Sequence, residues 1–308
     1  MRRCRLGCSL FIVGLLCSPL HAQSAKPDVA GGTTSSGSTN DEGAAGIIPF
    51  VKGPNLSLAT TSQHDSSDGW SSVLSPDFAW RFDRRFSADV EVPIYMYINV
   101  VVTKGTKAAP IYTLATKQGV FGDTAINGHY AVNPKFLEYD ATVTLGLPSG
   151  NSSYGLGAGQ VSYNTNNHFE KDFGPFTPDI ELGIGDNSSL IGTRVRKSYT
   201  TFGTLAHFQA GASVDMPFNA SFEADAYEEL PIAAQTLYST TGKGKKKVTT
   251  ATGTSVAEDN GFTTALDIPL NPHITLSGFY NRSLRNSIDT AGFSLTFFLR
   301  AAPPPKER

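Results

Sequence analysis

Acidic side chains recur at alternate positions of the predicted strands, and this spacing puts them on one face of a sheet. The clearest cation on that face is Arg81, and His129 and His207 share it. If the face lines a closed sheet, the carboxylates could form a negative constriction that favours cations or polar cationic solutes. They could equally fill the interior as a hydrogen-bonded plug. The acidic members are Asp77, Asp89, Glu91, Asp123, Glu138, Asp140, Asp179, Glu181, Glu223, Asp225 and Asp267.

A basic cluster lies in the longest candidate external loop, and it lacks the Gly-Lys-Ser/Thr ending of a phosphate-binding loop. A run of like charges is usually a solvated loop. The more specific alternative is that the lysines bind an anion, such as the phosphates of lipopolysaccharide. The lysines are Lys243, Lys245, Lys246 and Lys247.

Two other patterns do not have the residue spacing of a cofactor-binding or metal-binding motif. The glycines of Gly155-Leu-Gly157-Ala-Gly159 are out of register for dinucleotide binding, and no helix pattern follows them. The histidines at 64, 129, 168, 207 and 273 show no metal-ligand spacing. A membrane phospholipase would need a Ser/His pair facing lipid, and we expect no histidine on the lipid side. The sequence therefore predicts no metal, no cofactor and no enzymatic activity.

The elements that position these residues are predicted to be β-strands. Phe208, Ala210 and Val214 share one side of a segment whose other side carries His207 and Gln209. Alternation of this length means one apolar face and one polar face. We find no convincing helix period and no solenoid repeat.

Short and long connections are predicted to alternate along the chain, which leaves twelve strands between them. An even number of strands with tight turns at one end is typical of outer-membrane barrels. The tight turns are predicted at 83–85, 133–135, 171–175, 217–219 and 271–273. The long connections are predicted at 63–69, 99–119, 148–158, 186–197, 241–260 and 284–288.

A soluble sandwich would show the same alternation, so other features must decide. The predicted strands run to about 12–15 residues, which is enough to cross a bilayer when tilted. Aromatic residues crowd the short turns, where an interfacial girdle would lie. These residues are Phe82, Phe86, Phe136, Tyr139, Phe173, Phe176, Phe218 and Phe222.

The composition agrees with a barrel. The 308 residues are 40% hydrophobic and 17% charged, and no apolar stretch beyond residue 20 is as long as a membrane helix requires. In a barrel only every second strand residue faces lipid, so the average hydropathy hides the spans.

The N-terminus predicts a secretory signal peptide, because Arg2, Arg3 and Arg5 precede a short apolar core and a small-residue cleavage site. Cleavage would remove all three cysteines, and with them any disulfide or thiolate metal site. The predicted segments are a signal peptide at 1–22, a disordered periplasmic linker at 23–53, a barrel at 54–300 and a C-terminal tail at 301–308.

The last predicted strand resembles the assembly signal of bacterial outer-membrane proteins. That signal has a polar residue, a glycine two positions later, and then apolar or aromatic residues at fixed spacing. The matching residues here are Thr290, Gly292, Leu295 and Phe297. The resemblance implies the barrel-assembly machinery as a partner, although the tail after the strand departs from the usual aromatic ending.

Two glycine-rich elements resemble a family of outer-membrane proteins named for the meta-pathway of phenol degradation. Phe121-Gly122-Asp123 is similar to its Gly-Asp element, and Leu147-Pro148-Ser149-Gly150 with the following Gly155-Leu-Gly157 is similar to its glycine hairpin. Ser149 stands where threonine is commoner. The resemblance covers about residues 54–300 and implies a transporter barrel, often for aromatic or other hydrophobic compounds. It supplies no established ligand residues.

The sequence as a whole predicts an all-β protein, a 12-stranded antiparallel transmembrane β-barrel of the bacterial outer membrane. The expected function is passive passage of small solutes, such as aromatic or hydrophobic compounds. The alternative is a structural or adhesive barrel with a filled lumen that acts through external loops. The expected partners are outer-membrane lipid, lipopolysaccharide, the assembly machinery and a small-molecule solute, with no nucleic acid.

Overall fold

The structure is a computed structural model, and all that follows concerns the residues it describes. These are 52–106, 109–132, 136–151, 154, 156–157, 161–185, 204–232, 237–241, 248–253 and 258–299. The predicted signal peptide, nearly all of the predicted linker, the four loop lysines and the tail lie outside them.

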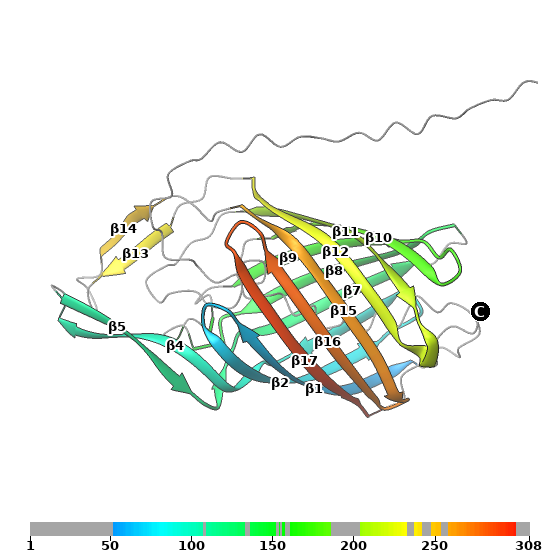
Figure 1. Cartoon of the computed structure of the whole chain (residues 1–308), viewed down its shortest axis with the longest axis horizontal. Helices are drawn as coiled ribbons and strands as arrows, with labels where there is room; N and C mark the ends of the chain where they lie inside the picture. Colours follow the sequence, from blue (N-terminus) through cyan, green and yellow to red (C-terminus); the bar gives the residue numbers. More distant parts are fainter. Residues whose placement is uncertain are drawn as a thin grey trace, which may run out of the picture.

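Twelve antiparallel strands form a closed ring, as predicted (Figure 1). The ring closes where β1 pairs with both β17 and β2, so none of its strands is left as an open edge. The ring strands are β1 (Gly53–Asp65), β2 (Gly69–Arg81), β3 (Phe86–Glu91), β7 (Thr124–Val132), β8 (Glu138–Leu147), β9 (Ser162–Glu170), β10 (Phe176–Gly185), β11 (Leu205–Asp215), β12 (Ser221–Pro231), β15 (Asp259–Asn271), β16 (Ile274–Ser283) and β17 (Ile288–Phe298).

Two positions of the ring continue as broken strands. β3 is followed after Val92-Pro93 by β4 (Ile94–Thr106), and β6 (Val120–Phe121) precedes β7 across Gly122-Asp123. β4 pairs with β2 and β6 at its start, then with β5 (Ala109–Lys117). The β4–β5 hairpin and a separate hairpin of β13 (Leu237–Thr241) and β14 (Val248–Gly253) lie beyond one end of the ring, on the left of Figure 1.

The connections differ in detail from the prediction. Tight turns join the strands at the right-hand end of Figure 1, and one of them contains the short 3-10 helix η2 (Pro217–Asn219). At the other end, two predicted long connections are also tight, because β1 ends at Asp65 and β17 begins at Ile288. The connections 99–119 and 241–260 were predicted as polar stretches. The first lies largely within the β4–β5 hairpin, and the second contains β14, which pairs with β13 just before it.

The strands are shorter than the predicted 12–15 residues at several ring positions. β1, β2 and β15 have 13 residues, whereas β7 and β9 have 9. About 9–11 tilted residues suffice to cross a bilayer, so β7 and β9 are long enough. The 6-residue β3 is continued by β4 after a two-residue break. The overestimate arose because alternation continues into residues that leave the ladder before the turn.

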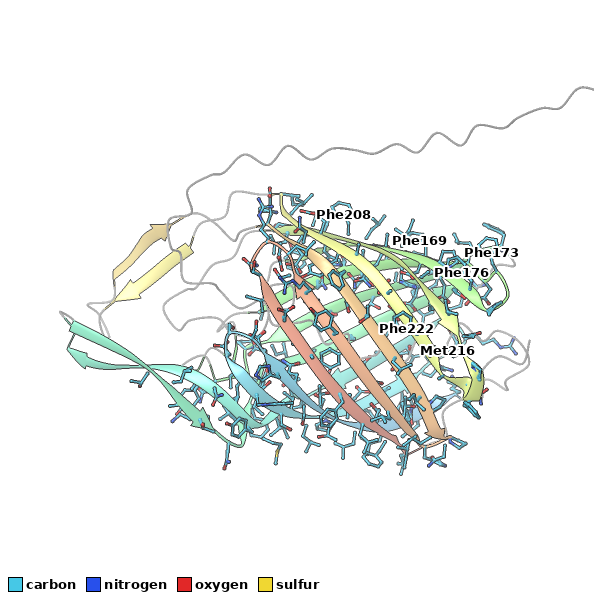
Figure 2. The ribbon with its side chains drawn as sticks, viewed as in Figure 1. Phe169, Phe173, Phe176, Phe208, Met216 and Phe222 are labelled. Atoms are coloured by element: carbon cyan, nitrogen blue, oxygen red, sulfur yellow. The ribbon has the colours of Figure 1, made fainter. Side chains whose placement is uncertain are left out.

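The outer face of the ring is apolar and exposed. Phe208 and Phe222 point outward from neighbouring strands, and Phe173 and Phe176 lie at the tight-turn end (Figure 2). Tyr130, Tyr139 and neighbouring phenylalanines form a ladder with ring centroids 4.9 to 6.5 Å apart. Phe86 and Tyr139 of this ladder are among the residues predicted for an aromatic girdle. In the described chain, no helix has the length and apolar character needed to cross a membrane.

Candidate functional site

The strand register sets a row of carboxylates across five neighbouring strands of the inner face. Glu138 on β8 lies opposite Glu170 on β9, which lies opposite Asp179 on β10. Asp179 lies opposite Gly211 on β11, and Gly211 lies opposite Asp225 on β12. We call Glu138, Glu170, Asp179, Gly211 and Asp225 the acidic row. Like charges on adjacent strands repel one another, so this row carries an electrostatic cost within the wall.

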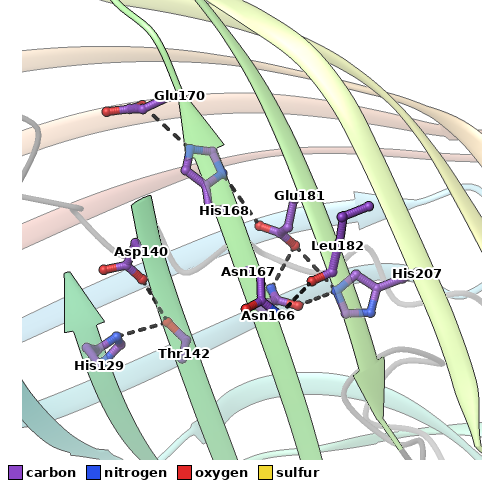
Figure 3. Close-up of polar contacts among 10 residues, drawn as sticks. All are labelled: His129, Asp140, Thr142, Asn166, Asn167, His168, Glu170, Glu181, Leu182 and His207. Carbon is purple, nitrogen blue, oxygen red and sulfur yellow. Dashed lines mark hydrogen bonds and ion pairs between the residues drawn. The ribbon is translucent and has the colours of Figure 1, made fainter. Parts of the chain in front are cut away.

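The neighbouring row of inner-face residues, one step closer to the long loops, has a histidine between two acids. His168 lies between Asp140 and Glu181 in the register (Figure 3). Its Nε2 is 3.5 Å from a Glu170 oxygen and its Nδ1 is 3.9 Å from a Glu181 oxygen. His168 is thus the nearest compensating group for the acidic row, and one imidazole faces several carboxylates.

A second histidine joins two parts of the wall. His129 Nε2 is 2.6 Å from Asp89 Oδ1, and its Nδ1 is 3.0 Å from the Thr142 hydroxyl. Thr142 donates in turn to Asp140 Oδ1 at 3.2 Å. Both ring nitrogens are therefore used, and the chain of contacts runs across β3, β7 and β8.

A third histidine lies one row further along. Asn166 Nδ2 donates to Glu181 Oε1 at 2.7 Å, and its Oδ1 contacts His207 Nε2 (Figure 3). Gly183 makes this possible, since a Cβ there would lie 2.0 Å from His207 Cε1. Asn167 belongs to the outer face instead, where it donates to the Leu182 carbonyl.

The acidic row contains buried carboxylate oxygens that have no hydrogen-bond partner among the described residues. Asp179 Oδ1 and Asp225 Oδ1 are two such atoms, on residues that are 8% and 5% exposed. The Asp225 oxygen occupies the space above Gly211, where a Cβ would meet it at 2.0 Å. An unsatisfied buried acceptor costs about 1–3 kcal/mol. Asp179 and Asp225 are therefore the strongest candidate for a site among the described residues.

The remaining predicted inner-face residues occupy the same face but form separate groups. Asp77 lies opposite Glu91 and accepts a hydrogen bond from Ser57 at 3.2 Å. Arg81, at the end of β2, lies opposite Gly53 and Ser87. The other predicted acids are placed on the same face of β12 and β15, with Glu223 opposite Ala265 and Asp267 opposite Ser221 and Ser277.

The sequence interpretation missed several inner acids. Glu170, Glu229 and Asp259 share the face through the register, and so does Asp65 at the end of β1. The signal that could have found them is the same alternation, extended to the strand ends. Among the described residues, the inner faces of β7 to β12 carry neither lysine nor arginine.

One expectation about histidine was wrong. His64 lies on the outer face of β1, because the inward positions of that strand are the odd-numbered residues that end at Asp65. Its ring packs edge-on against Trp70 at 5.3 Å, and Trp70 is 54% exposed. The sequence interpretation placed residue 64 in the predicted connection 63–69, whereas β1 continues to Asp65.

Asp123 does not act as a strand residue of the wall. It lies in the break between β6 and β7, and its Oδ1 accepts a hydrogen bond from Gly150 N at 2.8 Å. Ser149 Oγ accepts from Thr124 N at 2.8 Å. A Cβ on Gly150 would meet the Leu156 carbonyl at 2.2 Å, and one on Gly122 would meet Pro93 at 2.9 Å. The two glycine-rich elements therefore meet and fasten the loop after β8, which we call the loop anchor.

Beside the loop anchor lies a small apolar cluster. Leu156 is fully buried, and it packs with Tyr95, Ile98 and Val100 of the β4 hairpin. Val73, an inward residue of β2, packs against the same cluster. The anchored loop thus brings apolar side chains to the inner face at the long-loop end of the ring.

The residues of the proposed assembly signal divide between the two faces of β17. Thr290 is buried and donates to Asp65 Oδ2 at 2.9 Å. Gly292 faces Phe279, whose ring would lie 2.5 Å from an added Cβ. Leu295 and Phe297 lie on the outer face.

The described residues contain no group of three or more His, Cys, Asp or Glu side chains arranged to hold a metal ion. The acids are instead spread along the strand register, about 4.8 Å per strand. What the arrangement offers is an extended negative surface.

Comparison with known proteins supports the architecture. No protein-family model matches the chain, and no curated protein sequence does. An outer membrane channel from Pseudomonas putida F1 is structurally similar, with a TM-score of 0.54, 12% identity and coverage of 82% of this chain and 97% of that one. The NanC porin has a TM-score of 0.48 and 8% identity, and the match covers 78% of this chain and 98% of the porin. The toluene transporter TbuX of Ralstonia pickettii has a TM-score of 0.44 and 9% identity, and the match covers 82% of this chain and 90% of the transporter.

At these identities the similarity concerns the fold. That fold, with its closed backbone ladder and exposed apolar belt, is an outer-membrane barrel. The protein accordingly resides in the bacterial outer membrane.

Proposed function

We propose that the protein is a passive channel for small solutes. The observation that carries the proposal is the acidic row, because a wall designed only to be filled would pair its buried carboxylates. Asp179 and Asp225 keep unpaired oxygens instead. Negative side chains lining a pore favour cations, so we infer a preference for positively charged and polar solutes.

Aromatic or hydrophobic compounds are a second candidate. The family resemblance implies them, and the meeting of the two glycine-rich elements in the loop anchor supports membership of that family. The apolar cluster around Leu156 is the observation that favours such solutes. It lies at one end of the ring, whereas the inner faces of β8 to β12 carry acidic and uncharged polar residues.

The assembly machinery and lipopolysaccharide are proposed partners. A β17 with Gly292 inward and Phe297 outward is consistent with an assembly signal. The predicted signal peptide and linker fit export to the periplasm before assembly.

The test is ion and solute passage by the full chain in planar bilayers and liposomes. We expect discrete conductance in KCl and a reversal potential on the cation side in a salt gradient. Swelling in zwitterionic and amine solutes should exceed swelling in aromatic acids of equal size. Absence of conductance by protein that shows heat-modifiable migration on a gel would support a filled barrel and refute the channel.

A further inference from the structure

We propose that the acidic row binds organic ammonium ions, linear polyamines in particular, inside the lumen. The binding proposal rests on the proposed channel function in one respect, because the solute must enter the lumen through the channel. Binding itself depends on Asp179, Asp225 and the glycine between them.

The first step of the argument is the missing partner. Asp179 Oδ1 and Asp225 Oδ1 are buried within the wall, and neither accepts a hydrogen bond from the described protein. Both residues lie directly opposite Gly211, one on each side. Gly211 has no side chain, and Asp225 Oδ1 lies where its Cβ would be, 2.0 Å from that position.

The second step is charge. Glu223 lies two residues from Asp225 on the same face of β12, and Glu170 lies opposite Asp179. The compensating groups are His168, which already faces Glu170 and Glu181, and His207, whose Nε2 lies 3.5 Å from Glu181 Oε1. A cation supplied from outside would therefore meet more negative charge than the wall neutralises.

The third step is shape. A compact metal ion needs several ligands around one point, and the described side chains offer no such group. Asp179 and Asp225 are separated by two strand spacings, roughly 10 Å between backbones. A flexible diammonium can place N–H donors on separated carboxylates, and each ammonium donates up to about three hydrogen bonds.

Putrescine, the simplest such probe, is compared with Mg²⁺, which has equal charge. We expect putrescine to bind the full chain in detergent by calorimetry and to reduce K⁺ current in bilayers. Mg²⁺ should be about tenfold weaker, because it keeps its hydration shell and finds no ligand group.

Asp225→Asn should weaken putrescine binding about tenfold by removing a charge-assisted hydrogen bond. Asp179→Asn provides the same test if the first variant fails to assemble, as judged by heat-modifiable migration. The control is Asp267→Asn, which removes the same charge from the same inner face and should change binding by no more than about twofold.

Equal binding of Mg²⁺ and putrescine would overturn the proposal, as would equal losses in Asp225→Asn and Asp267→Asn. Conductance without putrescine binding would refute the site and leave the channel. Binding without conductance would support the site and refute the channel.

Discussion

Two parts of the same ring differ sharply inside while sharing one outer face. The inner faces of β8 to β12, which we call the acidic wall, carry the acidic row and three rows of polar contacts. The inner faces of β16, β17 and β1, which we call the neutral wall, carry small and hydroxyl residues such as Ser277, Ser294 and Thr61. Both walls are closed by the same backbone ladder, so the acids are unnecessary for forming the barrel.

The neutral wall also shows what a structural carboxylate looks like. Its acid is Asp65, at the end of β1, which accepts hydrogen bonds from Ser67 N at 2.7 Å, Ser67 Oγ at 2.6 Å and Thr290 Oγ1 at 2.9 Å. Asp225 has a buried oxygen with no such partner. The contrast separates a carboxylate whose oxygens accept hydrogen bonds from a turn and a neighbouring strand from one with a buried oxygen that no described group satisfies.

The largest expected effect comes from neutralising the acidic row. A variant with Glu138→Gln, Glu170→Gln, Asp179→Asn and Asp225→Asn should lose cation preference by about tenfold, because local cation enrichment depends on the summed field. The control, Thr61→Ala with Ser294→Ala, removes a hydroxyl contact of 3.1 Å on the neutral wall and should leave selectivity unchanged. Reversal potentials in a KCl gradient measure the selectivity of both variants. Equal selectivity would contradict a functional difference between the two walls.

A smaller effect is expected from adding one methyl group. Gly211→Ala would place a Cβ 2.0 Å from Asp225 Oδ1 and 2.3 Å from the Ala224 carbonyl. The resulting shift of backbone should lower the free energy of unfolding by about 1–3 kcal/mol. Gly278→Ala on β16 meets nothing within 4 Å and should change it by no more than about 0.5 kcal/mol. Urea unfolding in lipid vesicles, followed by tryptophan fluorescence, compares them.

Replacing an aspartate should change the free energy of unfolding differently in the two walls. Asp65→Ala should lower the free energy of unfolding by about 1–3 kcal/mol, because its donors lose their acceptor. Asp225→Asn should leave stability level or raise it by about 1 kcal/mol, because a neutral amide replaces one of several buried carboxylates that repel one another. Losses of similar size in the same urea assay would show that Asp225 is structural.

The smallest effect lies in a tight turn outside both walls. The backbone N–H groups of Arg85 and Phe86 donate to Asp83 and hold the pKa of this carboxyl below its usual range. Its contribution to stability is therefore present above the ordinary unfolded pKa of about 3.9 and lost as pH falls through the lower folded value. The stability difference between wild type and Asp83→Ala should be constant at neutral pH and shrink in acid. A difference that grows in acid would contradict this assignment.

The sequence predicted most of the barrel because alternation is a local property. His207 and Gln209 could be placed on one face of β11 without knowing what lay beside them. The strand count also followed from turn signals. The end of β1 could not be derived in this way. His64 was placed in the predicted connection 63–69, whereas pairing with β17 and β2 extends the strand to Asp65 and puts His64 on its outer face.

The site was only partly predictable for a related reason. Glu138, Asp179 and Asp225 were each assigned to the inner face from their own strands. Their alignment into one row through Gly211 depends on three inter-strand registers. Asp123 shows the opposite case, since its place in the polar pattern concealed a role in fastening a loop.

By itself the sequence determined an outer-membrane barrel, because period-two alternation, tight-turn chemistry and aromatic placement are set by neighbours along the chain. Only the tertiary structure decided which carboxylates share a row, which acid is satisfied and which is not. Register is a relation between segments far apart in sequence, and hydrogen-bond satisfaction depends on what that register brings together.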